Sequence, residues 1–94
     1  MFNEQDYIRK YNEDVNEIAD KCVKALTPED IEVLKKHPRS VEHHFDYGLY
    51  IRNQYIHGKI EAFCPDGMSS DIIKKILLKV VPNYDPELDD VVKV

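Results

Sequence analysis

The sequence contains little of what most catalytic motifs are built from. Of its 94 residues only three are glycine and two are cysteine, and tryptophan is absent. No glycine-rich loop that could cradle a phosphate group is present. Cys22 and Cys64 lie far apart and form no CxxC pair, so we expect both thiols to stay reduced and to behave as small apolar groups.

An excess of basic residues and a long apolar run are also missing. Eighteen Asp and Glu against thirteen Lys and Arg give a net charge of −5, whereas nucleic-acid binding needs clustered basic side chains. No apolar run approaches the ~20 residues that span a bilayer, and the first ten residues lack the apolar centre of a secretory signal. We therefore expect a cytoplasmic protein that binds neither nucleic acid nor a membrane.

The chain is instead patterned for helices. Its hydrophobic content of 43% and charged content of 33% fit one globular domain with a single core. Apolar side chains spaced alternately by three and four residues predict a long amphipathic helix over about residues 3–26. The residues in this stripe are Ile8, Tyr11, Val15, Ile18, Cys22 and Ala25.

Two further helices are predicted from their start signals. Thr27 and Pro28 are typical of a helix N-terminus. Ser40 predicts the start of a third helix that extends to about Asn53. Helical spacing places one set of its residues inward and another outward. The inward set is Val41, His44, Phe45, Gly48, Leu49 and Arg52, and the outward set is His43, Asp46, Tyr47 and Tyr50.

A last long helix is expected between a turn and a proline. Asp66 or Ser69 is predicted to cap it and Pro82 to end it, and Asp85 with Pro86 can start one more turn. The sequence thus predicts an all-α fold, a compact single domain of four or five short helices with a long N-terminal amphipathic helix. The helical domain is expected to cover residues 1–82, followed by an acidic C-terminal tail at residues 83–94.

Two motifs in the chain resemble those of a known family. Residues 27–80 resemble a small bacterial domain family of unknown function, whose core reads approximately H-F-x-x-G-x-x-I-R-N and then P-D-D-x-S-x-x-I. Asp46 and Gly67 depart from this pattern, where members often have a second glycine and a second aspartate. The resemblance implies a compact helical fold and supplies no activity, cofactor or catalytic residue. The matching residues are His44, Phe45, Gly48, Ile51, Arg52, Asn53, Pro65, Asp66, Ser69 and Ile72.

Arg52 is the residue that most needs an explanation, because the spacing places its charge on the apolar side of a helix. A buried guanidinium requires partners, and a bidentate pair with Asp66 would lock two elements together. Alternatively, Arg52 faces a pocket and binds a small anionic molecule such as a nucleotide. Arg52, His44, Asp66 and Asn53 would then be the ligand-binding residues.

The histidines and cysteines predict no metal site. The usual pair of histidines three or four residues apart on a helix is missing around His43, His44 and His57. Nothing near Cys64 in the sequence would activate its thiol as a nucleophile. We expect no catalytic residue, no metal and no cofactor, and a metal-assisted hydrolase is the least favoured alternative.

The tyrosines of the same region indicate a partner surface. Tyrosine is enriched at protein interfaces because it is large, rigid and amphipathic. Tyr47, Tyr50 and Tyr55 lie beside the acidic Glu42 and Asp46, which favours a protein partner with a basic surface. The leading hypothesis is a non-enzymatic protein-interaction module, an accessory or inhibitor-type protein of a bacterial or phage system. The pattern also permits a homodimer.

Overall fold

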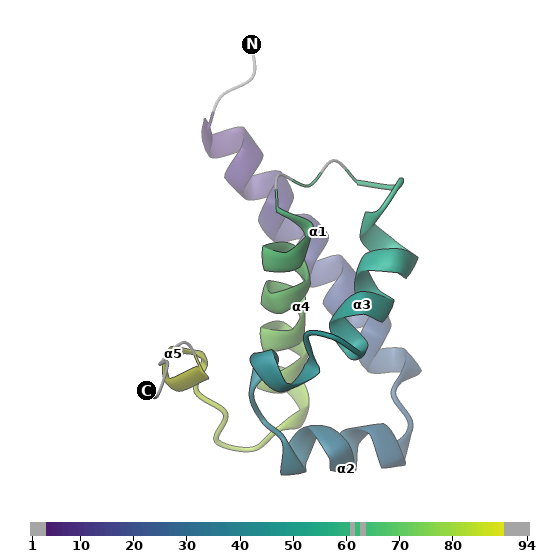
Figure 1. Cartoon of the computed structure of the whole chain (residues 1–94). Helices are drawn as coiled ribbons and strands as arrows, with labels where there is room; N and C mark the ends of the chain where they lie inside the picture. Colours follow the sequence, from purple (N-terminus) through teal and green to yellow (C-terminus); the bar gives the residue numbers. More distant parts are fainter. Residues whose placement is uncertain (1–3, 61, 63, 90–94) are drawn as a thin grey trace.

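Helices make up most of the chain. The structure is a computed structural model that describes residues 4–60, 62 and 64–89. It contains α1 (Glu4–Ala25), α2 (Pro28–Lys36), α3 (Tyr47–Ile51), α4 (Pro65–Val80) and α5 (Pro86–Asp89) (Figure 1). A 3₁₀ turn, η1 (Ser40–His43), precedes α3, and a π-helical turn, η2 (Arg52–Ile56), follows it. The predicted all-α fold with a long N-terminal helix is confirmed, and none of the described helices is long and apolar enough to cross a membrane.

The core lies between α1 and α4, which run side by side in the same direction (Figure 1). The Tyr11 hydroxyl donates a hydrogen bond to Asp71 near the start of this pair, and Lys79 forms a 2.8 Å ion pair with Asp20 near its end. These two contacts fix the register of the helices. The buried residues of the two helices are Val15, Ile18, Ala19 and Cys22 of α1 and Met68, Ser69, Ile72, Ile73, Ile76 and Leu77 of α4.

The shorter elements close the remaining sides of this core. The Thr27 side chain accepts a hydrogen bond from the backbone N–H of Asp30, and the Asp30 carboxylate accepts one from the backbone N–H of Thr27. This reciprocal capping confirms the predicted start of α2. Leu34 of α2, Ile51 of α3 and Ile56 of η2 complete the buried cluster. Each fully buried aliphatic side chain contributes about 1.5–3 kcal/mol, so the cluster is the main source of stability.

The prediction of one continuous helix over residues 40–53 is wrong. The chain passes through η1, a turn at residues 44–46, α3 and η2. Asp46 rather than Ser40 caps the α-helical part, because its carboxylate accepts a hydrogen bond from the backbone N–H of Tyr47. In η2 the N–H of His57 bonds the carbonyl oxygen of Arg52, five residues earlier. The 3₁₀, α and π turns differ in residues per turn, so a face calculated at one constant spacing drifts.

This drift accounts for the faces that were misassigned. His43 was expected outside and is buried, with 5% of its surface exposed. Val41, Phe45 and Leu49 were expected inside and are exposed by 64%, 86% and 47%. Gly48 and Arg52 are buried as predicted. The predicted inward and outward faces are therefore least accurate before α3, where the 3₁₀ turn η1 and the turn at residues 44–46 replace the expected α-helix.

The predicted caps of α4 are also wrong. Cys64 is the N-cap residue, and its sulfur accepts a hydrogen bond from the backbone N–H of Gly67 over 3.4 Å. Pro65 occupies the first helical position, where its missing N–H has no helical partner to lose. Ser69 is buried in the helix and serves a different purpose, described below.

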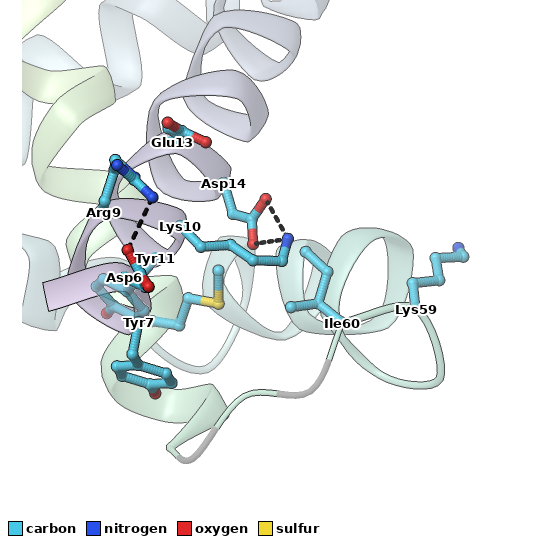
Figure 2. A pocket seen from close by; sticks show the side chains of 10 residues that line it. Asp6, Tyr7, Arg9, Lys10, Tyr11, Glu13, Asp14, Lys59 and Ile60 are labelled. Atoms are coloured by element: carbon cyan, nitrogen blue, oxygen red, sulfur yellow. Dashed lines mark hydrogen bonds and ion pairs between the residues drawn. The ribbon is translucent and has the colours of Figure 1, made fainter. Parts of the chain in front are cut away.

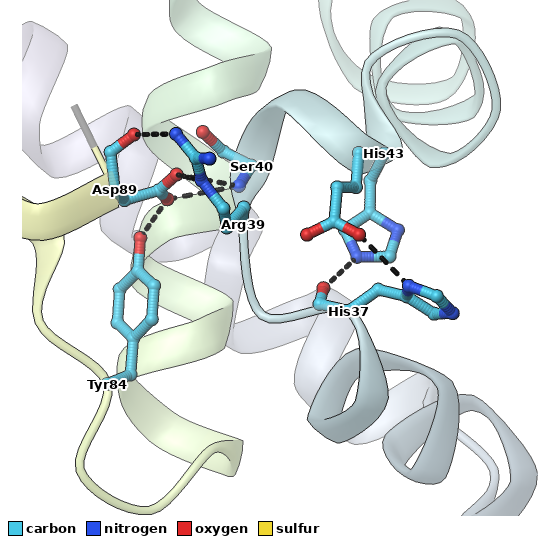
Figure 3. A network of polar contacts seen from close by, with 7 residues as sticks. His37, Arg39, Ser40, His43, Tyr84 and Asp89 are labelled. Carbon is cyan, nitrogen blue, oxygen red and sulfur yellow. Dashed lines mark hydrogen bonds and ion pairs between the residues drawn. The ribbon is translucent and has the colours of Figure 1, made fainter. Parts of the chain in front are cut away.

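The segment that was expected to form an acidic tail begins with an anchor to the body of the protein. Asp89 is 8% exposed, and both its carboxylate oxygens lie 3.0 Å from the backbone nitrogen of Ser40 (Figure 3). The Tyr84 hydroxyl donates to the same carboxylate, and Arg39 approaches it. Asp89 therefore anchors the end of α5 to η1, and residues 90–94 lie outside the described residues.

Candidate functional site

Three of the four predicted ligand-binding residues meet at one place. The Arg52 Nε lies 3.4 Å from a carboxylate oxygen of Asp66, and His44 Nε2 lies 4.0 Å from the other oxygen. Arg52 enters from η2 and Asp66 from the first turn of α4. Asn53 is an exposed residue of η2, and no hydrogen bond or ion pair with this group is observed for it. Arg52 is thus paired with Asp66 as predicted, but through a single 3.4 Å contact rather than the expected bidentate pair.

The remaining nitrogens of Arg52 also have protein partners. Nη1 donates to the Ser69 hydroxyl over 2.9 Å, and Nη2 donates to the His44 backbone carbonyl over 3.2 Å. The side chain of Arg52 is 8% exposed, whereas that of Asp66 is 68% exposed. All three guanidinium nitrogens are therefore engaged by the protein, and the geometry is that of a clamp between η2, α4 and the turn before α3.

Gly48 makes room for this clamp. A Cβ atom at position 48 would lie 3.1 Å from Arg52 Nη1 and 3.2 Å from the His43 carbonyl oxygen. Both distances are shorter than ordinary van der Waals contact, so a side chain here would push the guanidinium away from Ser69. The glycine in the middle of the motif is explained by this close approach.

The cysteines lie in two different environments. Cys22 is buried, and burial raises the pKa of its thiol, while hydrogen bonds from Tyr47 and Tyr55 act in the opposite direction. Cys64 is exposed at the start of α4. Within residues 4–60, 62 and 64–89, no group of three or more His, Cys, Asp or Glu side chains is arranged to hold a metal ion.

The predicted partner surface divides into exposed and half-buried members. Glu42, Asp46 and Tyr50 are exposed, with the Tyr50 ring stacked 6.2 Å from that of Tyr47. Tyr47 and Tyr55 are half-buried and serve as hydrogen-bond partners of the Cys22 thiol. Their pKa values are raised, first by burial. Tyr47 and Tyr55 thus cover helix α1 at the same time as they border the surface.

The exposed part of this region carries an unusual number of apolar side chains. Nine large apolar residues in the described ranges are exposed, and four of them fall within residues 41–50. We define the α3 surface by the exposed residues of this segment, of which Phe45 is the most exposed at 86%. Its members are Val41, Glu42, Phe45, Asp46, Leu49 and Tyr50.

A hollow of about 300 Å³ opens beside the α3 surface, between α2 and α3. Tyr47 links the hollow to the α3 surface, because its ring stacks on that of Tyr50. Its hydroxyl contacts the Cys22 thiol, and the negative charge of the nearby Asp30 contributes to raising the pKa of Tyr47. We call this cavity the α2–α3 hollow. Its lining residues are Leu26, Asp30, Val33, Leu34, His43, Asp46 and Tyr47.

A larger hollow of about 750 Å³ lies beside the N-terminal half of α1 (Figure 2). Its charged side chains are paired along the helix, Arg9 with Asp6 at 2.8 Å and Lys10 with Asp14 at 3.2 Å. Neither this hollow nor the α2–α3 hollow is lined by Arg52. The α1 hollow is therefore lined mainly by polar side chains, and four of its charged groups pair with one another.

Comparison with known proteins gives no match, whether to family models, to curated proteins or to solved structures. The resemblance to a small bacterial family therefore stays a prediction.

Sequence reasoning missed the α2–α3 hollow and the role of Asp89. The hollow depends on how two short helices pack, for which no motif in the sequence gives a signal. Asp89 had one available signal, since Tyr84, Pro86 and Leu88 supply an apolar character that a purely solvated tail does not need. His43 had none, because its burial follows from the 3₁₀ turn at η1.

Proposed function

We propose that the protein is a non-enzymatic protein-interaction module that binds its partner through the α3 surface. The observation that carries the proposal is the exposure of Phe45 together with Val41, Leu49 and Tyr50 on one ten-residue segment. An aromatic side chain left in water forgoes about 1.5–3 kcal/mol of burial. Apolar side chains that gather in this way on a surface are typical of protein-binding sites.

The charge of the surface indicates the character of the partner. Glu42 and Asp46 lie between the exposed apolar residues, and the net charge of the chain is −5. Glu42 is joined to His37, with His37 Nδ1 2.9 Å from a carboxylate oxygen, whereas no ion pair of Asp46 with a described basic residue is observed. A partner with a basic rim around an apolar centre complements this pattern.

The small-molecule alternative is less well supported by the geometry. An anion binder needs a guanidinium whose donors are open to the ligand. Each nitrogen of Arg52 is instead occupied by Asp66, Ser69 or the His44 carbonyl oxygen. We therefore assign Arg52 to the stability of the fold, and an accessory or inhibitor-type role of the module remains part of the proposal.

Site-specific photo-crosslinking tests this proposal. A photoreactive amino acid at position 45 is expected to form a specific adduct with a protein in an extract of the source cells. The same amino acid at Glu13, an exposed position on α1, is the control and should give no such adduct. Equal labelling from both positions, or no adduct from position 45, would remove the α3 surface as a partner site.

A further inference from the structure

We propose that the α2–α3 hollow receives one large apolar side chain of the partner, and that Lys or Arg residues beside this anchor meet Asp30 and Asp46. This inference rests on the proposed function, because Asp46 belongs both to the hollow and to the α3 surface. It assigns a specific occupant to the hollow: a protein segment that is apolar at one position and basic on either side of it.

The first support is the charge left at the hollow. Asp30 and Asp46 each accept a backbone hydrogen bond, from Thr27 and Tyr47 respectively. Neither carboxylate forms an observed ion pair with a basic residue of the described part of the chain. His43 is the one lining residue that can become a cation, and its Nε2 is held 2.7 Å from the His37 carbonyl oxygen. The hollow is therefore negative and calls for a cationic complement.

The α1 hollow provides an internal comparison. There the carboxylates of Asp6 and Asp14 are matched by Arg9 and Lys10 on the same helix. Intrahelical pairs of this kind neutralise their own surface and leave little attraction for a charged partner. The α2–α3 hollow thus differs from the α1 hollow in having carboxylates without an observed ion pair, and this difference favours a basic ligand.

The second support is the size and floor of the hollow. Leu26, Val33 and Leu34 supply apolar walls, and Val33 remains 51% exposed although it lies on the side of α2 that lines the hollow. A volume of about 300 Å³ is at the lower limit of cavities that hold small molecules. It suits a single anchoring side chain of the kind that dominates protein interfaces.

The chain itself contains one segment of related chemistry. Tyr7 and Ile8 are exposed on α1 beside Arg9 and Lys10. Both cations pair with Asp6 and Asp14 of their own helix, so this segment of a second copy would also bring two carboxylates toward Asp30 and Asp46. A separate partner is therefore favoured over self-association.

Selection from a displayed library of random short peptides tests the inference. The full chain serves as bait, and enriched peptides are measured against the wild type and the double variant Asp30→Asn, Asp46→Asn. Asparagine still accepts the capping hydrogen bonds, so this variant removes charge while keeping the helix starts. The double variant Glu13→Gln, Glu87→Gln removes the same charge from exposed positions elsewhere and is the matched control.

The inference predicts peptides in which one large apolar residue is flanked by Lys or Arg. Their affinity should fall by about tenfold or more for Asp30→Asn, Asp46→Asn and stay unchanged for the control, with a strong dependence on salt. No enrichment, enrichment without basic residues, or equal affinity for both variants would overturn it. Dimerisation of the wild type that is abolished by Asp30→Asn, Asp46→Asn would overturn it in favour of a second copy. A crosslinked partner at position 45 that is indifferent to these variants would leave the proposed function intact while this inference fails.

Discussion

The guanidinium of Arg52 and the hydroxyl of Ser69 lie 2.9 Å apart in the interior, where they join η2 to α4. Ser69 donates in turn to the Asp66 carbonyl oxygen over 2.9 Å, so one hydroxyl connects the arginine to the first turn of α4. A charge on the apolar side of a helix is costly unless it is paired. Here the pairing is supplied by groups that belong to the fold, which is why we separate Arg52 from the partner surface.

Replacing Arg52 with methionine should destabilise the protein in the absence of any ligand. The change removes the donor to the His44 carbonyl oxygen and the link to Ser69, while the exposed Asp66 is returned to water. We expect a loss of about 1–3 kcal/mol in the free energy of unfolding, measured by urea denaturation followed by circular dichroism. Arg9→Met on the exposed face of α1 is the control and should change it by less than about 0.5 kcal/mol. Unchanged stability of the Arg52 variant would reopen the ligand-binding alternative.

Gly48→Ala should also destabilise the protein, although alanine favours helix by about 1 kcal/mol over glycine. The added methyl group would lie closer to Arg52 Nη1 and the His43 carbonyl oxygen than ordinary van der Waals contact, so these groups would have to shift. We expect the steric cost to exceed the helix gain and to leave a net loss of about 1–2 kcal/mol.

A double-mutant cycle with Arg52→Met checks the cause. The double variant should lose less unfolding free energy than the sum of the losses in the two single variants, because the methionine side chain can move away from position 48. Strict additivity would show that Gly48 acts independently of the arginine.

Asp89→Ala should release the segment that was expected to be a free tail. The buried backbone N–H of Ser40 would lose its acceptor, and Tyr84 and Arg39 would lose a partner. We expect a loss of about 1–3 kcal/mol in the free energy of unfolding. Hydrogen exchange of the Ser40 amide should speed up markedly, whereas Glu87→Ala, at an exposed position of α5, should leave it unchanged. Equal exchange in wild type and Asp89→Ala would contradict the anchor.

The buried hydroxyl of Tyr47 should make the free energy of unfolding fall at alkaline pH. Burial, followed by the nearby Cys22, raises the pKa of this tyrosine above its ordinary value. The unfolded chain gives up the proton at about pH 10 while the folded chain still holds it, so stability is fully present below that pH and declines as the pH rises further. Tyr47→Phe should therefore reduce the fall in the free energy of unfolding between about pH 9 and pH 11. An equal fall in both proteins would show that Tyr47 is not protected in the fold.

The sequence was most informative where one helix type continues over many residues. The helices α1 and α4 were predicted because each keeps one spacing from end to end, although Ile8 and Ala25 of the α1 stripe are exposed. Thr27 gave a reliable start because its capping hydrogen bonds involve only residues within three positions. Local chemistry was sufficient in these places.

The sequence was least informative between residues 40 and 56. There the backbone changes from a 3₁₀ turn to an α-helix and then to a π turn, and each change rotates the following side chains. For this reason Phe45, which was predicted to be buried, is exposed, and His43, which was predicted to be exposed, is buried. Arg52 was still placed correctly together with Asp66, because an inward arginine must find a carboxylate or carbonyl wherever the backbone brings one.

The affinity of the crosslinked partner for surface variants tests the central claim most directly. Once the protein captured at position 45 has been purified, its binding to Phe45→Ala is measured by calorimetry beside Leu78→Ala, which shortens an exposed apolar residue of α4. The α3 surface predicts an affinity about tenfold or more weaker for Phe45→Ala and unchanged for Leu78→Ala. Equal affinity of wild type and Phe45→Ala would contradict the account and place the partner on another face of the protein.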